Sequence, residues 1–92
     1  MNKVVLINED NHGLIGVANN YYNAVKWLIE NGWLNSFDYI WMEDNRWKTI
    51  IDALGENWKD LMLNEWDIDK FNEIFQESFS LALVNIIGTE EE

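Results

Sequence analysis

The chain has 92 residues and a formal net charge of −11, from 17 acidic and 6 basic residues. A chain this short predicts one domain, residues 1–92, because two halves would each be too small to bury a core. Its 48% hydrophobic content and six tryptophans exclude a disordered chain. The absence of cysteine excludes disulfides, thiol catalysis and cysteine-bound zinc.

Charge and composition also bear on partners and location. The negative field disfavours direct binding to nucleic acid or to an anionic membrane, and favours a basic protein surface. The first apolar run, residues 4–7, is too short for the core of a signal peptide, and no stretch approaches a membrane span. A cysteine-free chain fits a reducing compartment, so we expect a cytoplasmic protein.

The first elements predicted along the chain are two strands. Apolar runs at 4–7 and 14–18 flank a polar segment that ends at Gly13, which predicts a β-hairpin. Gly13 suits the left-handed backbone position in the turn.

A helix follows the hairpin. Asn19-Asn20 can cap it, and the apolar stripe comprises Tyr21, Val25, Leu28 and Ile29. Asn31-Gly32 is typical of a helix C-terminus. Aromatic residues then alternate with other residues around Asp38, so a short strand at 38–42 is possible.

The strongest helical periodicity lies between residues 46 and 63. Apolar residues recur there at spacings of three or four: Trp47, Ile50, Ile51, Leu54, Trp58, Leu61 and Met62. Asp44 or Asn45 can cap the start. Gly55 either lies within a continuous or kinked helix, which we favour, or separates two helices on one axis.

A last helix is predicted after Asp67, which can cap it, with Ile68, Phe71, Ile74 and Phe75 on its apolar stripe. A closing strand is predicted at 79–87, and the acidic tail 88–92 is expected to fray. The fold class is therefore α+β: a small antiparallel sheet of three strands, possibly four, with three helices packed on one face. The order is strand, strand, helix, possible strand, helix, helix, strand.

The acidic residues on the predicted helices form two rows at a spacing of four. The first row is Asp52, Glu56 and Asp60, and the second is Glu65, Asp69, Glu73 and Glu77. Like charges at this spacing cost about 0.2–0.5 kcal/mol per pair. Acids one turn apart, about 5.4 Å along the axis, approach the separation of successive phosphates and could imitate a nucleic-acid backbone. The alternative is that both rows are solvated faces that serve solubility only.

Catalytic patterns are missing from the sequence. It contains no phosphate-binding glycine loop, no nucleophile elbow and no histidine pair at helical spacing. His12 is the only histidine, and with Glu9 and Asp10 it fits a hairpin turn better than a metal site. We therefore expect no enzyme, no cofactor and no metal.

The tryptophans fall into two groups by position. Trp47 and Trp58 lie on the apolar stripe of the predicted helix and are expected in the core, whereas Trp27 lies near the edge of its stripe. Trp33, Trp41 and Trp66 lie at element ends. Exposed aromatic residues there would suit a protein interface or, as an alternative function, a pocket for a small molecule or nucleotide signal.

Several stretches carry a resemblance to a known group of proteins: residues 9–18, residues 24–34, Gly55-Glu56-Asn57-Trp58, and residues 68–73. They resemble small acidic uncharacterised proteins carried by phages and mobile elements of low-GC Gram-positive bacteria. This resemblance implies an inhibitor of a host nuclease or defence complex, such as a CRISPR effector or restriction enzyme, in the host cytosol. The oligomeric state is not predicted.

Overall fold

The computed structural model describes residues 3–42, 46–75 and 78–85. The elements are β1 (Lys3–Glu9), β2 (Gly13–Ala18), α1 (Tyr21–Glu30), β3 (Tyr39–Met42), β4 (Arg46–Thr49), α2 (Ile50–Leu54), α3 (Trp58–Asn64), α4 (Ile68–Phe75) and β5 (Phe79–Asn85). A three-stranded sheet has the order β2-β1-β5, and β3 and β4 form a separate two-stranded sheet. The predicted α+β class is confirmed.

The predicted N-terminal hairpin is confirmed as β1 and β2. His12 N–H donates to the carbonyl of Glu9 at 3.1 Å, and Gly13 has the left-handed φ of 73° that the turn requires. The register of the pair shifts between Ile7 and Asn8. Strand β5 pairs antiparallel with β1 along its whole length, which places β1 at the centre of the sheet.

Helix α1 begins and ends where the sequence predicts. The side chain of Asn20 accepts a hydrogen bond from Asn23 N–H at 2.8 Å, as a helix N-cap does. Gly32, with a φ of 81°, follows the last turn. Ala24, Val25 and Leu28 of this helix are buried.

The prediction of one helix over residues 46–63 is wrong. Residues Arg46–Thr49 form β4, and α2 begins only at Ile50, where Thr49 Oγ1 accepts from Asp52 N–H at 3.3 Å. Helix α2 ends at Gly55, whose φ of 91° and ψ of −177° belong to a region open almost only to glycine. The predicted caps Asp44 and Asn45 lie outside the described residues.

Helix α4 and β5 follow the prediction closely. Asp67 Oδ1 accepts from Lys70 N–H at 2.9 Å and caps α4. The Asn72 side chain then joins α4 to β5: its Nδ2 donates to the carbonyl of Leu81 at 2.9 Å, and its Oδ1 accepts from Leu81 N–H at 2.8 Å. The closing strand is described as far as Asn85, so its predicted end at 87 and the tail 88–92 lie outside the described residues.

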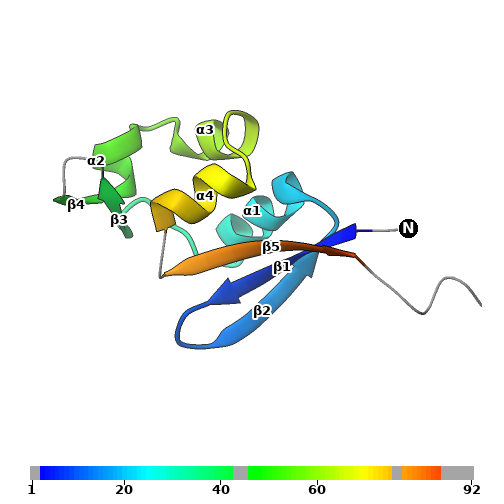
Figure 1. Ribbon diagram of the computed structural model, residues 1–92. Helices are drawn as coiled ribbons and strands as arrows, with labels where there is room; N and C mark the ends of the chain where they lie inside the picture. Colours follow the sequence, from blue (N-terminus) through cyan, green and yellow to red (C-terminus); the bar gives the residue numbers. More distant parts are fainter. Residues whose placement is uncertain (1–2, 43–45, 76–77, 86–92) are drawn as a thin grey trace, which may run out of the picture.

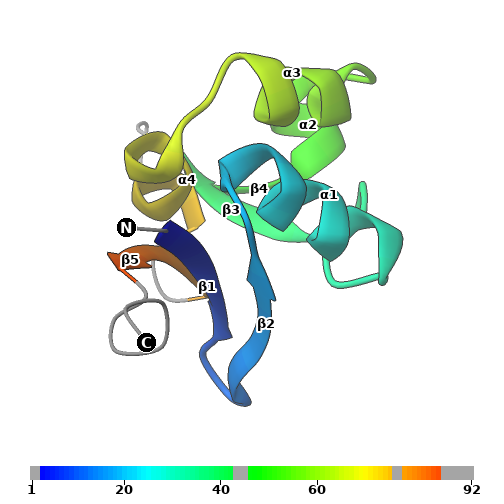
Figure 2. The same cartoon turned by 90° about the vertical axis from the view of Figure 1, so that its right-hand side faces the viewer.

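The elements form layers, with α1 and α4 between the three-stranded sheet and the pair α2–α3 (Figures 1 and 2). The predicted fourth strand, β3, therefore pairs in the small sheet and not in the main one. The core lies between the main sheet and the helices and includes Val5, Ile7, Leu28, Phe71 and Leu81.

The opposite face of the main sheet is also apolar. Val4 and Leu6, which alternate with the core residues of β1, are only partly buried. On β2, the side chains of Leu14 and Val17 are 57% and 53% exposed. No helix in the described part of the chain covers this face (Figure 1).

Candidate functional site

The acids of the two predicted rows lie at the surface. Six of the seven are described and all six are exposed: Asp52, Glu56, Asp60, Glu65, Asp69 and Glu73. Glu77 lies outside the described residues. Within those residues, none of the six acids is within ion-pair distance of a base. Their charges are therefore available to a partner.

The first row is not built as predicted. Asp52 lies on α2, Glu56 in the turn after Gly55, and Asp60 in the first turn of α3. The three carboxylates are on separate elements, because the backbone at Gly55 ends α2 before another turn can form. The axial spacing that would imitate a phosphate backbone does not apply to them.

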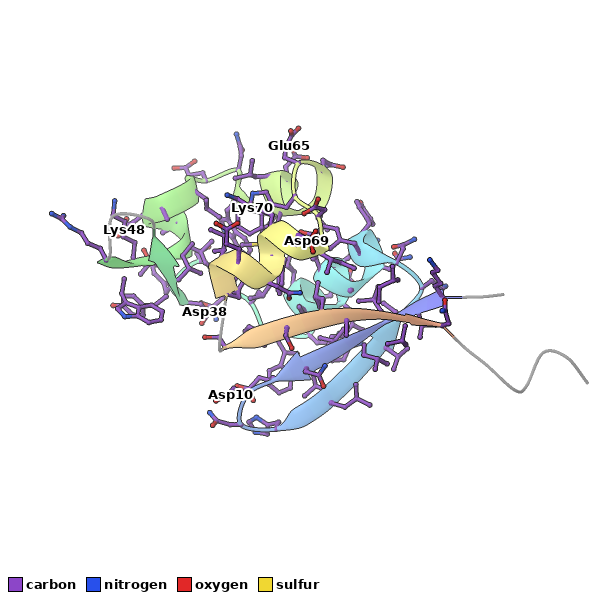
Figure 3. The ribbon with its side chains drawn as sticks, in the orientation of Figure 1. Asp10, Asp38, Lys48, Glu65, Asp69 and Lys70 are labelled. Carbon is purple, nitrogen blue, oxygen red and sulfur yellow. The ribbon has the colours of Figure 1, made fainter. Side chains whose placement is uncertain are left out.

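The second row is partly built. Glu65 is the C-cap residue of α3, whereas Asp69 and Glu73 lie on α4, one turn apart. Figure 3 shows Glu65 at the outer end of α3 and Asp69 on the neighbouring helix. Asp69 also borders a hollow of about 370 Å³ whose lining includes Tyr21, Ile68 and Leu83. We call Asp69, Glu73 and this hollow the α4 surface.

The burial of the tryptophans agrees with the prediction from the sequence at Trp58 and differs from it at Trp47. Trp58 is 2% exposed, as predicted, and its Nε1 donates to Ser36 Oγ at 3.1 Å. Trp47 is 58% exposed, so its prediction as a core residue is wrong, because it lies on β4 and not on a helix stripe. Trp27, Trp33 and Trp66 are partly buried. The side chain of Trp41 is outside the described part.

A second site was not predicted from the sequence. A cavity of about 390 Å³ lies between the end of β1, the start of β5 and the β3–β4 sheet. Its lining includes five aromatic residues and two acids: Trp33, Tyr39, Trp47, Phe75, Phe79, Glu9 and Asp38. We call it the aromatic cavity, and its volume lies within the range of about 300–1,000 Å³ that is usual for small-ligand sites.

Short polar interactions hold the two carboxylates of the cavity. Glu9 Oε1 accepts from Asn11 N–H at 2.9 Å and lies 2.5 Å from His12 Nδ1. This hydrogen bond with His12 holds the pKa of Glu9 below its ordinary value, so the carboxylate stays charged. Asp38 Oδ2 accepts from Asn35 N–H at 2.9 Å.

Ring contacts connect the aromatic cavity to the core. His12 packs edge-on against Trp33 with centroids 5.6 Å apart, and Trp33 packs edge-on against Phe79 at 6.4 Å. Phe79 in turn contacts Phe75 at 6.0 Å, and Phe75 stacks on Phe71 at 4.4 Å. The inner wall of the cavity is thus continuous with the hydrophobic core.

In comparisons with known proteins, no family model, curated protein or solved structure matches the chain. The described residues include no cluster of three or more histidine and acidic side chains arranged to hold a metal ion. Within the same residues, no helix is long and apolar enough to cross a membrane.

Proposed function

We propose that the protein is a non-catalytic binding protein whose α4 surface docks on a basic surface of another protein. The observation that carries this proposal is the exposure of six acids that are not paired with bases among the described residues. A net charge of −11 steers such a protein toward basic partners over distances of about a Debye length, roughly 8–10 Å in physiological salt.

The α4 surface combines charge with apolar area. Asp69 and Glu73 lie one turn apart on α4, and the hollow beside Asp69 is lined in part by Ile68 and Leu83. Leu83 is 52% exposed. An apolar centre with a polar, solvent-accessible rim is the usual anatomy of a protein interface.

The partner class that fits this charge is an enzyme that handles nucleic acid, such as a nuclease, a restriction enzyme or a CRISPR effector. Such enzymes carry basic clefts that neutralise phosphates. The protein would occupy the cleft and inhibit the enzyme. Among the described residues, nucleic-acid mimicry by helical spacing now rests on Asp69 and Glu73, since the first row is not on one helix.

The test is salt-dependent binding to purified nucleases and CRISPR effectors, together with inhibition of nucleic-acid cleavage. Reversing both charges on α4, with Asp69→Lys and Glu73→Lys, should abolish binding. The matched control reverses two exposed acids elsewhere, Asp10 and Glu30, and should retain most of it. If no such enzyme binds in a salt-sensitive way, or both double variants behave alike, the proposal fails.

A second candidate function, binding of a small molecule, is favoured by the aromatic cavity. A nucleotide is a poor fit there, because its phosphates would meet the carboxylates of Glu9 and Asp38. A positively charged ligand suits the lining better. A thermal-shift screen with metabolites of both charges tests this function, and stabilisation by anions alone would contradict it.

A further inference from the structure

We propose that the aromatic cavity binds a guanidinium group. The group has two sources: the arginine side chain of a basic partner, or a free molecule that carries the same group. In its first form the inference deepens the proposed function and rests on it. In its second form it stands alone.

The walls of the cavity suit a planar cation. Tyr39 is 63% exposed and Trp47 is 58% exposed, and both line the cavity together with Trp33 and Phe79, whose rings pack edge-on. A guanidinium group stacks on aromatic faces, where the negative face of the ring attracts the charge. Several large rings in one lining give such a cation aromatic surface to contact.

The two carboxylates have spare hydrogen-bond capacity. The interactions of Glu9 use Oε1, and that of Asp38 uses Oδ2. A guanidinium group presents five N–H donors in a rigid plane and pairs strongly with carboxylates.

These features select guanidinium over other organic cations. The ammonium group of lysine is compact and strongly hydrated, so it gains less from ring faces. A trimethylammonium group has no N–H donor and so cannot donate a hydrogen bond to the carboxylate of Glu9 or Asp38. Of the residues that the structure describes, none that lines the cavity is basic, so none opposes a bound cation.

The site is also held in place before a ligand arrives. Asp38 is fixed by the 35–38 turn, in which Asn35 Oδ1 also accepts from Phe37 N–H at 3.0 Å. The same turn is joined to α2, because Ile50 N–H donates to the carbonyl of Asp38 at 2.8 Å. Rigid placement reduces the ordering cost of binding.

The first experiment titrates the full chain with N-acetyl-arginine amide and follows the indole N–H signals by NMR. The signals of Trp33 and Trp47 should shift and saturate, while that of buried Trp58 should not. N-acetyl-lysine amide and its trimethylated form should bind more weakly. Equal binding of the trimethylated form, or no saturable shift at Trp33 and Trp47, would overturn the proposal.

Isosteric variants locate the charge that matters. Asp38→Asn and Glu9→Gln retain an acceptor oxygen for the existing hydrogen bonds, and each should weaken binding by about tenfold, the loss expected for one charge-assisted hydrogen bond. Asp10→Asn removes the same charge from an exposed neighbour outside the cavity lining and should bind as the parent protein does. If all three variants bind alike, general charge attraction explains the signal and the inference is wrong.

A second arm identifies the source of the guanidinium group. An arginine-rich peptide that binds far more tightly than the single residue, with the gain lost in Asp69→Asn, points to a protein partner. Equal affinity for both probes points to a free ligand. If the enzyme partner binds the parent protein and Asp38→Asn equally, its arginine does not use the cavity, although the proposed function stands. If N-acetyl-arginine amide saturates the cavity and no basic enzyme binds, the proposed function fails alone.

Discussion

Replacement of Asn72 by alanine should destabilise the protein by about 2–4 kcal/mol. The Asn72 side chain makes two hydrogen bonds to the backbone of Leu81, at 2.8 and 2.9 Å, and Leu81 is only 3% exposed. Each bond contributes about 0.5–1.5 kcal/mol, and a buried polar group left without a partner costs about 1–3 kcal/mol. The total is a large part of the roughly 5–15 kcal/mol that stabilises a domain.

Urea unfolding followed by tryptophan fluorescence measures this loss. The Asn72→Ala midpoint should fall by about 2 M with an unchanged slope, since m is about 1–3 kcal/mol/M for small domains. The control is Asn64→Ala on α3, where the exposed side chain donates to Asp60 Oδ1 at 2.7 Å. Both variants gain about 0.5 kcal/mol of helix propensity and both lose a side-chain hydrogen bond, so their difference measures how much more the bonds to buried Leu81 contribute than an exposed bond does. Equal midpoints for the two variants would refute the reasoning.

Three further predictions follow from the backbone and from titrating groups. Gly55→Ala should lower the free energy of unfolding in urea by about 1–3 kcal/mol. The cause is backbone strain at a φ of 91° and not a steric clash, since no atom would meet the new Cβ within 4 Å. An unchanged urea midpoint would contradict this. Burial raises the pKa of Tyr21, whose hydroxyl donates to the carbonyl of Met62 at 2.7 Å. The stability that the neutral Tyr21 hydroxyl contributes is therefore complete below the unfolded pKa of about 10 and is lost as pH rises above it. Between about pH 9 and 11, Tyr21→Phe should lose less stability than the parent protein does. Finally, His12→Ala should raise the pKa of Glu9 toward its ordinary value in an NMR carboxyl titration, and an unchanged Glu9 titration would show that His12 does not lower it.

Elements with explicit caps could be predicted from the sequence. Asn20 and Asp67 accept hydrogen bonds from the first turns of α1 and α4, and Gly13 has the positive φ of the predicted turn. These signals are local: the residue that ends an element and the atoms it bonds lie within a few positions of each other. Local chemistry therefore predicted these boundaries well.

The stripe from Trp47 to Met62 misled the prediction because spacing alone does not show where a helix stops. Apolar residues on α2 and α3 both face the core, so the pattern continues across the break at Gly55. Thr49 lies three residues before Asp52 and accepts from its N–H, and this cap was the signal for a later start. Trp47, before the cap, falls on a strand and is exposed.

The aromatic cavity could not be predicted, because its residues are distant in the chain. Glu9, Trp33, Asp38 and Trp47 come from the first hairpin, the region after α1, the 35–38 turn and β4. Only tertiary structure brings them together. By contrast, Asp69 and Glu73 on α4 were named from the sequence as partner-binding residues, and their role in binding stays a prediction.

The open face of the main sheet has a thermodynamic consequence. Val4, Leu6, Leu14 and Val17 keep part of their apolar surface in water in the folded state. Unfolding does not newly hydrate that area, and newly hydrated apolar area is the main source of the positive heat-capacity change. The heat capacity of unfolding should thus fall below the value expected from a 48% hydrophobic composition. The curve of stability against temperature should be correspondingly flat, with little variation across the physiological range.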